Sequence, residues 1–181
     1  MRLFTAIDIP DTLRDKAMGF IQMLRPSAEA RWSPGSNLHI TTKFLGEVPP
    51  EELPPVIGAL HALKTGQPIP ITLGGVGWLP NPHSPKILCL GVRAPDTLLA
   101  LHARLDAAMA ALGVPPETKP FRPHLTLARI PRGCSVVELR HVIATLAVNE
   151  LGSFEASEFS LYQSQVQPSG SVYVKRESFV L

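Results

Sequence analysis

Several features that mark large classes of protein are missing from this sequence. It contains no long run of Lys or Arg and carries a formal net charge of only +2, which argues against extensive binding to double-stranded nucleic acid. It has no stretch of 18 apolar residues, so no membrane-spanning helix is predicted. The amino-terminal segment MRLFTAID reaches Asp8 before the apolar core of a signal peptide is complete. We therefore expect a protein that is not exported.

Cysteine and metal-ligand patterns are scarce too. Cys89 and Cys134 lack the paired spacing of a metal site and do not suggest a disulfide framework, so we expect reduced thiols in a cytoplasm. None of the six histidines stands four residues from another, and no carboxylate or cysteine pattern completes a metal site. We expect neither a metal ion nor a cofactor.

The composition is that of an ordinary soluble domain. Apolar residues make up 45% of the chain and charged residues 18%. A chain of this length corresponds to about one domain and buries roughly 70% of its unfolded surface. The 19 prolines predict many rigid connections between short elements. We expect a monomer that forms a single domain over residues 1–181.

One short motif occurs twice. His39-Ile40-Thr41 stands inside NLHITTKFLGEV, and His124-Leu125-Thr126 stands inside FRPHLTLARI, 85 residues later. The tetrapeptide Pro-Asp-Thr-Leu at 10–13 recurs at 95–98 with the same offset. The chain therefore indicates an internal duplication. Two related halves would bring two equivalent histidines to one pseudo-twofold axis.

Each half is predicted to run in the same order: strand, helix, strand with the His-x-Thr motif, helix, strand. Asp11 is placed to cap the first helix, and Gly113 to end its equivalent in the second half. Ser135 and Glu138 have the spacing of a capping box. This order predicts an α+β protein with two lobes facing each other across a cleft. Besides the two motif strands, we expect strands near 2–9, 69–78, 86–93, 154–163 and 171–180, and helices near 11–24, 51–64, 96–112 and 135–147.

Each motif strand has one face that carries its polar, potentially reactive side chains. Side chains alternate along a strand, so His39 and Thr41 point the same way, as do His124 and Thr126. By the same alternation, Lys43 shares the face of His39. The opposite face of the first strand, which includes Ile40 and Phe44, is mostly apolar and suited to packing under the sheet.

Two facing imidazoles supply an acid and a base. Imidazole titrates near pH ~6.5, so a pair holds one neutral and one protonated ring near neutrality. The Thr41 and Thr126 hydroxyls can donate to the non-bridging oxygens of a phosphate between the rings. These parts fit phosphodiester cleavage without a metal, with His39 and His124 as the catalytic pair. The other histidines are weaker candidates, and His102, beside an apolar helix stripe, is expected at the edge of the core.

At these residues the sequence resembles the two-histidine phosphoesterase superfamily, in particular the bacterial and archaeal RNA 2',3'-cyclic phosphodiesterases, historically named 2'-5' RNA ligases. The similarity includes RLFTAIDIP, both motif segments, GVGWLPNPHSPKILCLGV and FSLYQSQVQPSGSVYVKRESFVL. It implies a bilobal fold, with two pseudo-twofold-related lobes of antiparallel sheet and outer helices around a central cleft. It also implies hydrolysis of a 2',3'-cyclic phosphate at an RNA 3' end to a 2'-phosphate.

The resemblance also implies roles for single residues. His39 would be the proton donor and His124 the proton acceptor that activates water, an assignment that near-symmetry leaves open on physical grounds. Thr41 and Thr126 would hold the phosphate, and Arg129 would contact the substrate end. Strand alternation, however, aims Arg129 away from the cleft unless the strand bends, so a surface salt bridge is its alternative.

Three other functions stay open. One is a phosphodiesterase for small cyclic phosphates, such as cyclic nucleotides or ADP-ribose cyclic phosphate. The second is 2'-5' RNA ligation, in which an RNA 5'-hydroxyl replaces water. The third is a non-enzymatic module that binds RNA ends. The presence of both histidines and both threonines argues against a binding module. Water is a more abundant nucleophile than an RNA 5'-hydroxyl, so hydrolysis of RNA ends is the leading hypothesis.

Overall fold

The computed structural model describes residues 1–64, 66–93, 96–146, 150–168 and 170–181. In these parts of the chain the strands are β1 (Arg2–Asp8), β2 (Arg31–Trp32), β3 (His39–Glu47), β4 (Ile69–Leu79), β5 (Ile87–Arg93), β6 (His124–Arg129), β7 (Gly152–Ala156), β8 (Glu158–Gln167) and β9 (Gly170–Val180). The α-helices are α1 (Asp11–Leu24), α2 (Leu53–His61), α3 (Asp96–Ala110) and α4 (Val137–Thr145). Short 3-10 helices cover 25–27, 35–37 and 50–52.

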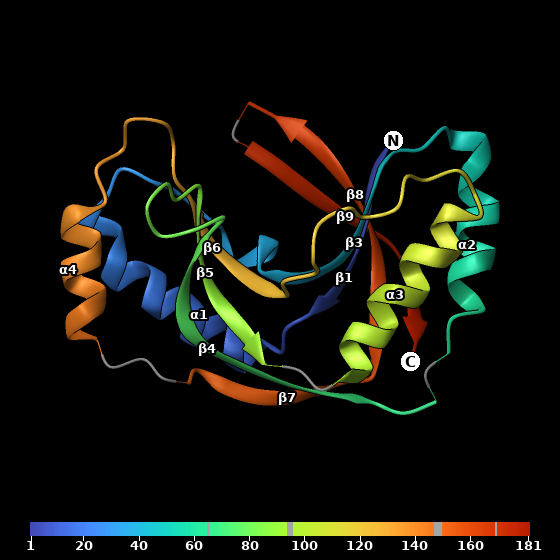
Figure 1. Ribbon diagram of the computed structural model, residues 1–181, viewed down its shortest axis with the longest axis horizontal. Coiled ribbons are helices and arrows are strands. Elements are labelled where there is room, and N and C mark those ends of the chain that lie inside the picture. The colour runs from blue at the N-terminus through green and yellow to red at the C-terminus, as the bar shows by residue number, and fades with distance from the viewer. Residues whose placement is uncertain (65, 94–95, 147–149, 169) are drawn as a thin grey trace.

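The strands form one antiparallel sheet in two groups of four. Its order is β7-β4-β5-β6-β3-β1-β8-β9, and β2 pairs with β6 outside this path. The described residues join the groups at one pairing between the central strands, Ile40 of β3 with Leu125 of β6. Each group and its helices make one lobe (Figure 1). The predicted α+β class and the antiparallel lobes with outer helices are confirmed.

The two halves of the sequence exchange strands. β4 ends the first half of the chain but pairs with β5 of the second, and β8 of the second half pairs with β1 of the first. The helices are exchanged as well, because α1 packs with α4 on one lobe and α2 with α3 on the other (Figure 1). Each lobe is therefore built from both halves of the sequence.

The core forms where the sequence pattern predicts it. The apolar stripe of α1 is buried, and so is most of the stripe of α3, where only Ala108 and Leu112 at its end are half-buried. Burying each such leucine or phenylalanine side chain contributes about 1.5–3 kcal/mol to folding, so these stripes fix both helices on the sheet. The buried residues are Leu13, Ala17, Phe20, Ile21 and Leu24 in α1, and Leu98, Leu101, Leu105 and Met109 in α3.

The helix starts differ from the prediction. α1 begins at Asp11 itself, and the Pro10 carbonyl before it accepts the first hydrogen bonds of the helix. The Asp11 carboxylate pairs with Arg14 one turn later and lies at the positive end of the helix dipole. The predicted capping box of Ser135 and Glu138 does not form. α4 begins at Val137, and no side chain in the described residues caps it.

The helix ends agree better. α3 finishes at Ala110, before the predicted stop at Gly113, whose φ of 84° suits glycine. Residue 147, the predicted last residue of the fourth helix, and Pro95 of the repeated tetrapeptide lie outside the described residues. Within the described parts, every helix is too short or too polar to cross a membrane.

Candidate active site

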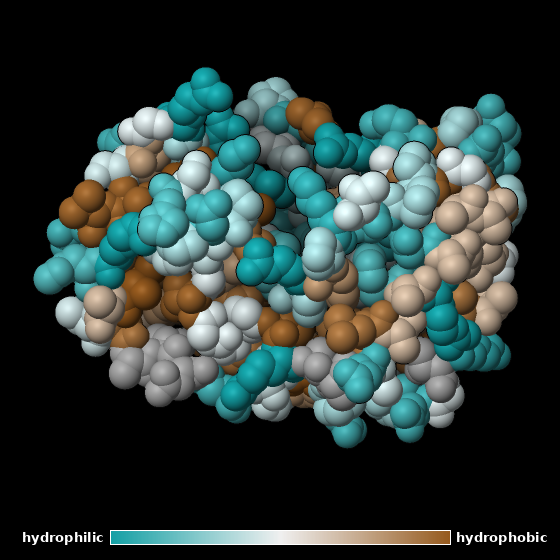
Figure 2. Space-filling view, in the orientation of Figure 1, coloured by the Kyte–Doolittle hydropathy of each residue, from teal (hydrophilic) through white to brown (hydrophobic). Residues whose placement is uncertain are grey.

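Both predicted motifs lie on the two central strands of the sheet, where the lobes meet. His39 begins β3 and His124 begins β6, and the two strands run antiparallel beside each other. A cavity of about 480 Å³ opens between the lobes, and its lining includes both histidines together with Thr41, Thr126 and Arg129. In the space-filling view the surface is hollowed between the lobes, with mainly hydrophilic side chains around the hollow (Figure 2). The five residues predicted from the sequence therefore share one cavity.

A β-bulge interrupts each motif strand at the same place. In β3, Ala6 pairs with Thr41 and Thr5 with Lys43, which leaves Thr42 as the extra residue. In β6, the partners of neighbouring β5 residues are Thr126 and Ala128, so Leu127 is the extra residue, 85 positions after Thr42. A bulge shifts the alternation of side chains by one residue from that point on. It therefore redirects the residues that follow each motif.

The bulges correct three predictions based on strict alternation. Arg129 faces the cavity instead of pointing away from it. Phe44, the equivalent position 85 residues earlier, also lines the cavity and is 58% exposed, so it does not pack under the sheet. Lys43 does not share the face of His39 and is only 4% exposed. The residues that follow the two motifs thus contribute one phenylalanine and one arginine to the lining of the cavity.

The first bulge is held by helix α3. The Lys43 ammonium donates to Asp106 Oδ1 at 2.6 Å and to the Pro115 carbonyl at 3.0 Å. The hydrogen bond from Lys43 lowers the pKa of Asp106 despite its burial. His102 Nδ1 donates to the Thr42 carbonyl at 2.7 Å. His102 is thus a half-buried residue at the edge of the core, as predicted, with a specific partner in the bulge.

His39 lies in a crowded, aromatic part of the cavity. Its ring centroid is 5.0 Å from that of Phe4 and 5.2 Å from that of Tyr173, and its Nε2 lies 3.0 Å from Thr41 Oγ1. Burial lowers the pKa of His39 from 6.5 to about 4, although the Asn37 backbone and the Asp8 carboxylate oppose this change. In the free protein the ring is therefore neutral at neutral pH.

His124 shares one contact with His39, a hydrogen bond to the backbone two residues earlier, but lacks the aromatic neighbours described for His39. Its Nδ1 lies 2.7 Å from the Arg122 carbonyl oxygen, and a carbonyl oxygen only accepts, so this nitrogen must carry the proton. In the neutral ring Nε2 is then unprotonated and available as a proton acceptor. The two histidines are equivalent in sequence but not in surroundings.

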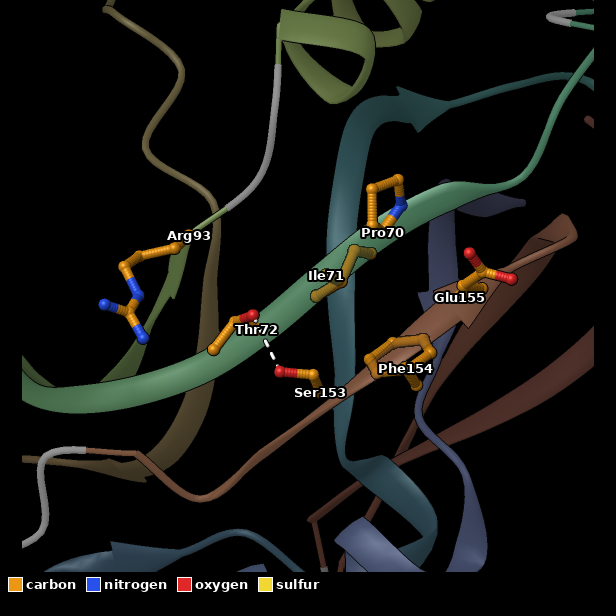
Figure 3. A pocket seen from close by; sticks show the side chains of 7 residues that line it. All are labelled: Pro70, Ile71, Thr72, Arg93, Ser153, Phe154 and Glu155. Carbon is orange, nitrogen blue, oxygen red and sulfur yellow. Dashed lines mark hydrogen bonds between the residues drawn. The ribbon is translucent and has the colours of Figure 1, made fainter.

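Of two further cavities, one adjoins this site and the other lies apart from it. One of about 530 Å³ adjoins it, shares Thr41, Phe44 and His124, and extends to Phe121, whose ring stacks on His102 at 4.0 Å. The other, of about 460 Å³, lies between β4 and β7 on the outside of the sheet, where Thr72 and Ser153 share a hydrogen bond (Figure 3). The outer cavity contains none of the predicted site residues. Among the described residues no group of three or more His, Cys, Asp and Glu side chains could hold a metal ion.

Some residues around the site were not predicted. Phe4, Asn37 and Tyr173 line the cavity from β1, the turn before β3, and β9. Asp8 lies behind His39, where it accepts a hydrogen bond from the Tyr162 hydroxyl. No motif marks these positions, because they reach the site through strand pairing between distant segments. The one available signal is Asp8, a charged residue ending an otherwise apolar strand.

Comparison with known proteins gives a consistent result. A family model described as the 2'-5' RNA ligase superfamily matches residues 10–168. A protein of Archaeoglobus fulgidus named RNA 2',3'-cyclic phosphodiesterase is 34% identical over 173 residues, 96% of each chain. A protein of Methanothermobacter thermautotrophicus with the same name is 32% identical over 183 residues, 100% of this chain and 99% of that one. The crystal structure of E. coli LigT complexed with 3'-AMP superposes with a TM-score of 0.82 at 29% identity, covering 99% of this chain and 97% of the other.

Proposed function

The chain belongs to the 2'-5' RNA ligase superfamily, and from this membership we propose that it hydrolyses 2',3'-cyclic phosphate ends of RNA with His39 and His124 as its acid–base pair. The resemblance noted in the sequence is thereby confirmed. The observation that carries the proposed site is that two His-x-Thr strands and Arg129 meet at one cavity.

The relatives support both the reaction and the substrate. Two curated proteins named RNA 2',3'-cyclic phosphodiesterase match nearly the whole chain at 32% and 34% identity. The similar E. coli LigT structure holds 3'-AMP, a nucleoside monophosphate. The substrate is accordingly an RNA 3' end that carries a cyclic phosphate.

In the proposed mechanism one water molecule opens the ring. His124 Nε2 takes a proton from the water as its oxygen bonds to phosphorus, because Nδ1 of the ring already donates to the Arg122 carbonyl. The bond from phosphorus to O3' breaks, and His39 gives its proton to the departing oxygen. The product is a 2'-phosphomonoester beside a free 3'-hydroxyl. Acid and base each accelerate such a step by about 10²–10⁴.

His39 must gain a proton before it can act as the acid. Burial keeps it neutral in the free protein, where its pKa is about 4. A phosphate anion in the cavity adds a nearby negative charge, which favours the protonated ring. Substrate binding thus charges the acid at the moment when it is needed.

The other predicted residues bind the phosphate and its nucleoside. Thr41, Thr126 and Arg129 present donors toward the cavity, and an arginine can hold two phosphate oxygens at once. Phe44 separates the polar cavity from the adjoining apolar one and is exposed to both. A terminal base fits this position, since unpaired bases stack on aromatic rings.

The first test is to incubate the purified protein in EDTA with a short RNA that ends in 2',3'-cyclic phosphate. We expect a 2'-phosphate product from the wild type and almost none from His39→Ala or His124→Ala. His83→Ala, in an exposed loop, is the matched control. Wild-type turnover by both cavity variants would exclude the histidine pair. Equal turnover of a cyclic mononucleotide would instead favour a small-molecule substrate.

We also propose that the protein works as a cytoplasmic monomer and that its single domain arose by duplication. Support for the compartment comes from Cys89 and Cys134, which are both free thiols. Support for the duplication comes from β1 and β5, whose bounds differ by 85 residues, and from the two equivalent bulges. Sedimentation of the purified protein tests the oligomeric state.

A further inference from the structure

The pseudo-symmetry of the site breaks down beside the histidines. Next to His39, Phe4 of β1 pairs with Tyr162 of β8, and their rings stack with centroids 5.5 Å apart. The equivalent positions in the other lobe are Cys89 of β5 and Gly77 of β4, which pair in the same way. Large aromatic side chains thus stand on one side where small ones stand on the other.

The rings around His39 form a three-sided cage made of Phe4, Tyr162 and Tyr173. Phe4 and Tyr162 lie roughly parallel to the imidazole, at interplanar angles of 30° and 20°. Tyr173 meets both the imidazole and Phe4 edge-on, at 77° and 76°. The cage restricts the imidazole in two directions, so the position of each ring bears on the position of His39.

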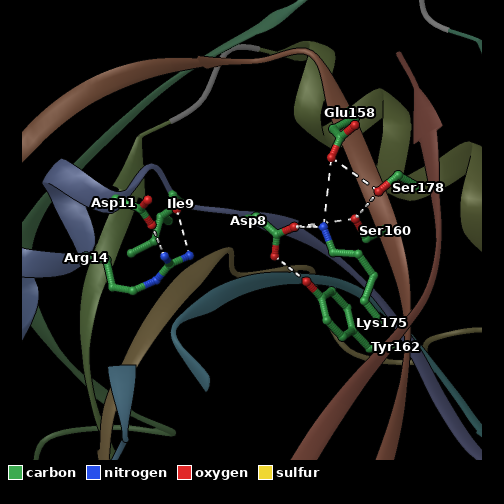
Figure 4. A network of polar contacts seen from close by, with 9 residues as sticks. All are labelled: Asp8, Ile9, Asp11, Arg14, Glu158, Ser160, Tyr162, Lys175 and Ser178. Carbon is green, nitrogen blue, oxygen red and sulfur yellow. Dashed lines mark hydrogen bonds and ion pairs between the residues drawn. The ribbon is translucent and has the colours of Figure 1, made fainter. Parts of the chain in front are cut away.

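One carboxylate holds this cage from behind. Asp8 Oδ1 accepts a hydrogen bond from the Tyr162 hydroxyl at 2.5 Å, and Oδ2 accepts one from Lys175 at 2.6 Å (Figure 4). Ser160 donates to Oδ2 at 3.4 Å. Burial disfavours the charged carboxylate, but the hydrogen bonds from Lys175 and Tyr162 outweigh it and lower the pKa of Asp8. Asp8 is therefore ionised at neutral pH.

Asp8 is also the direct strand partner of His39. The two residues face each other in the antiparallel pairing of β1 with β3, and side chains of such partners lie on the same side of the sheet. We propose that Asp8 is a positioning residue for His39, which it serves by fixing the Tyr162 ring against the imidazole and by holding a negative charge behind it. This inference rests on the proposed function, since it assigns His39 a proton to deliver.

The charges around His39 explain why such a residue is needed. From β6, His124 and Arg129 disfavour a proton on His39, and burial disfavours it further. From β1, the Asp8 carboxylate favours the protonated ring. Tyr162 and Lys175, from β8 and β9, bind this carboxylate, and Tyr173 of β9 contributes a neutral ring edge. The negative charge of Asp8 thus opposes the effects of burial, His124 and Arg129 on the pKa of His39.

The experiment compares two substitutions, each of which removes one negative charge from the same polar network. Asp8→Asn removes the carboxylate that contacts Tyr162. In the described parts of the chain the Glu158 carboxylate contacts Ser178 and Lys175, at 3.2 and 3.9 Å, and Glu158→Gln removes its charge. Titration of His39 by NMR in the free proteins, and the pH dependence of kcat/KM on a cyclic-phosphate RNA, are measured for both variants.

We expect Asp8→Asn to lower the pKa of His39 and to reduce kcat/KM by about three- to tenfold above that pKa, because fewer rings carry a proton. Glu158→Gln should match the wild type in both measurements. An unchanged His39 titration in Asp8→Asn would overturn the inference. The NMR titration needs no activity, so its result stands apart from any failure of the proposed function.

A second variant covers a failure of Asp8→Asn to fold. Tyr162→Phe keeps the carboxylate and the ring but removes the hydrogen bond between them. We expect a lower kcat with little change in KM, since the ring beside His39 is no longer fixed. A kcat equal to that of the wild type would overturn the positioning role.

Discussion

The low pKa of His39 makes the stability of the protein depend on pH in a calculable way. Burial lowers this pKa from 6.5 to about 4 on folding. Folding therefore excludes a proton that the unfolded chain binds at mildly acid pH. The resulting contribution to stability is fully present above pH 6.5 and is lost as the pH falls toward 4.

The size of the effect follows from the two pKa values. At pH 5 the unfolded chain has protonated this imidazole almost completely, while the folded chain keeps it neutral. The difference lowers the free energy of unfolding by about 2 kcal/mol relative to pH 7. His39→Gln removes the titrating group and keeps a polar side chain at the same position. Its stability should therefore fall by about 2 kcal/mol less than that of the wild type between these pH values.

Urea unfolding of both proteins at pH 7 and pH 5 measures this difference. Thr126→Val is a suitable control, because it alters the same cavity without removing a titratable group and leaves the contact of His39 with Thr41 in place, so it should keep the pH dependence of the wild type. An equal loss of stability in the wild type and His39→Gln would refute the reasoning. His39 would then be exposed to solvent enough to keep an ordinary pKa.

Four other outcomes are expected. His124→Ala should lower kcat by about a hundredfold or more, as measured with a cyclic-phosphate RNA, while binding of inorganic phosphate persists. Arg129→Lys should lower kcat/KM less than Arg129→Gln does, because lysine keeps the charge but loses the two-pronged contact; equal losses would contradict a charge contribution. Lys43→Met should cost about 2 kcal/mol in urea unfolding, since Asp106 loses its buried partner. Saturating phosphate should raise the pKa of His39 in an NMR titration, and an unchanged value would place the anion elsewhere.

Local chemistry made much of this molecule predictable. The apolar stripe of α1 repeats with the period of a helix, and it is buried as predicted. The two His-x-Thr motifs drew attention because polar residues recurred at matching strand positions, and the structure brings all four side chains to one cavity. These features depend on neighbours within a few residues of the chain.

The remainder depends on contacts between distant segments. The bulges at Thr42 and Leu127 arise from pairing with β1 and β5, so alternation within a single strand placed Lys43, Phe44 and Arg129 wrongly. The first helix begins at Asp11 and has Pro10 as its N-cap residue, although the capping preference of aspartate predicted Asp11 in that role. The network of Asp8 joins β1 to β8 and β9 across more than 150 residues of chain.

The exchange of strands between the halves also sets an order on folding during synthesis. β1 leaves the ribosome well before β8, one of its two partner strands. Until β8 emerges, β1 exposes an unpaired apolar edge of the kind that promotes aggregation. The lobe that carries His39 therefore becomes complete only after β8 and β9 have been made.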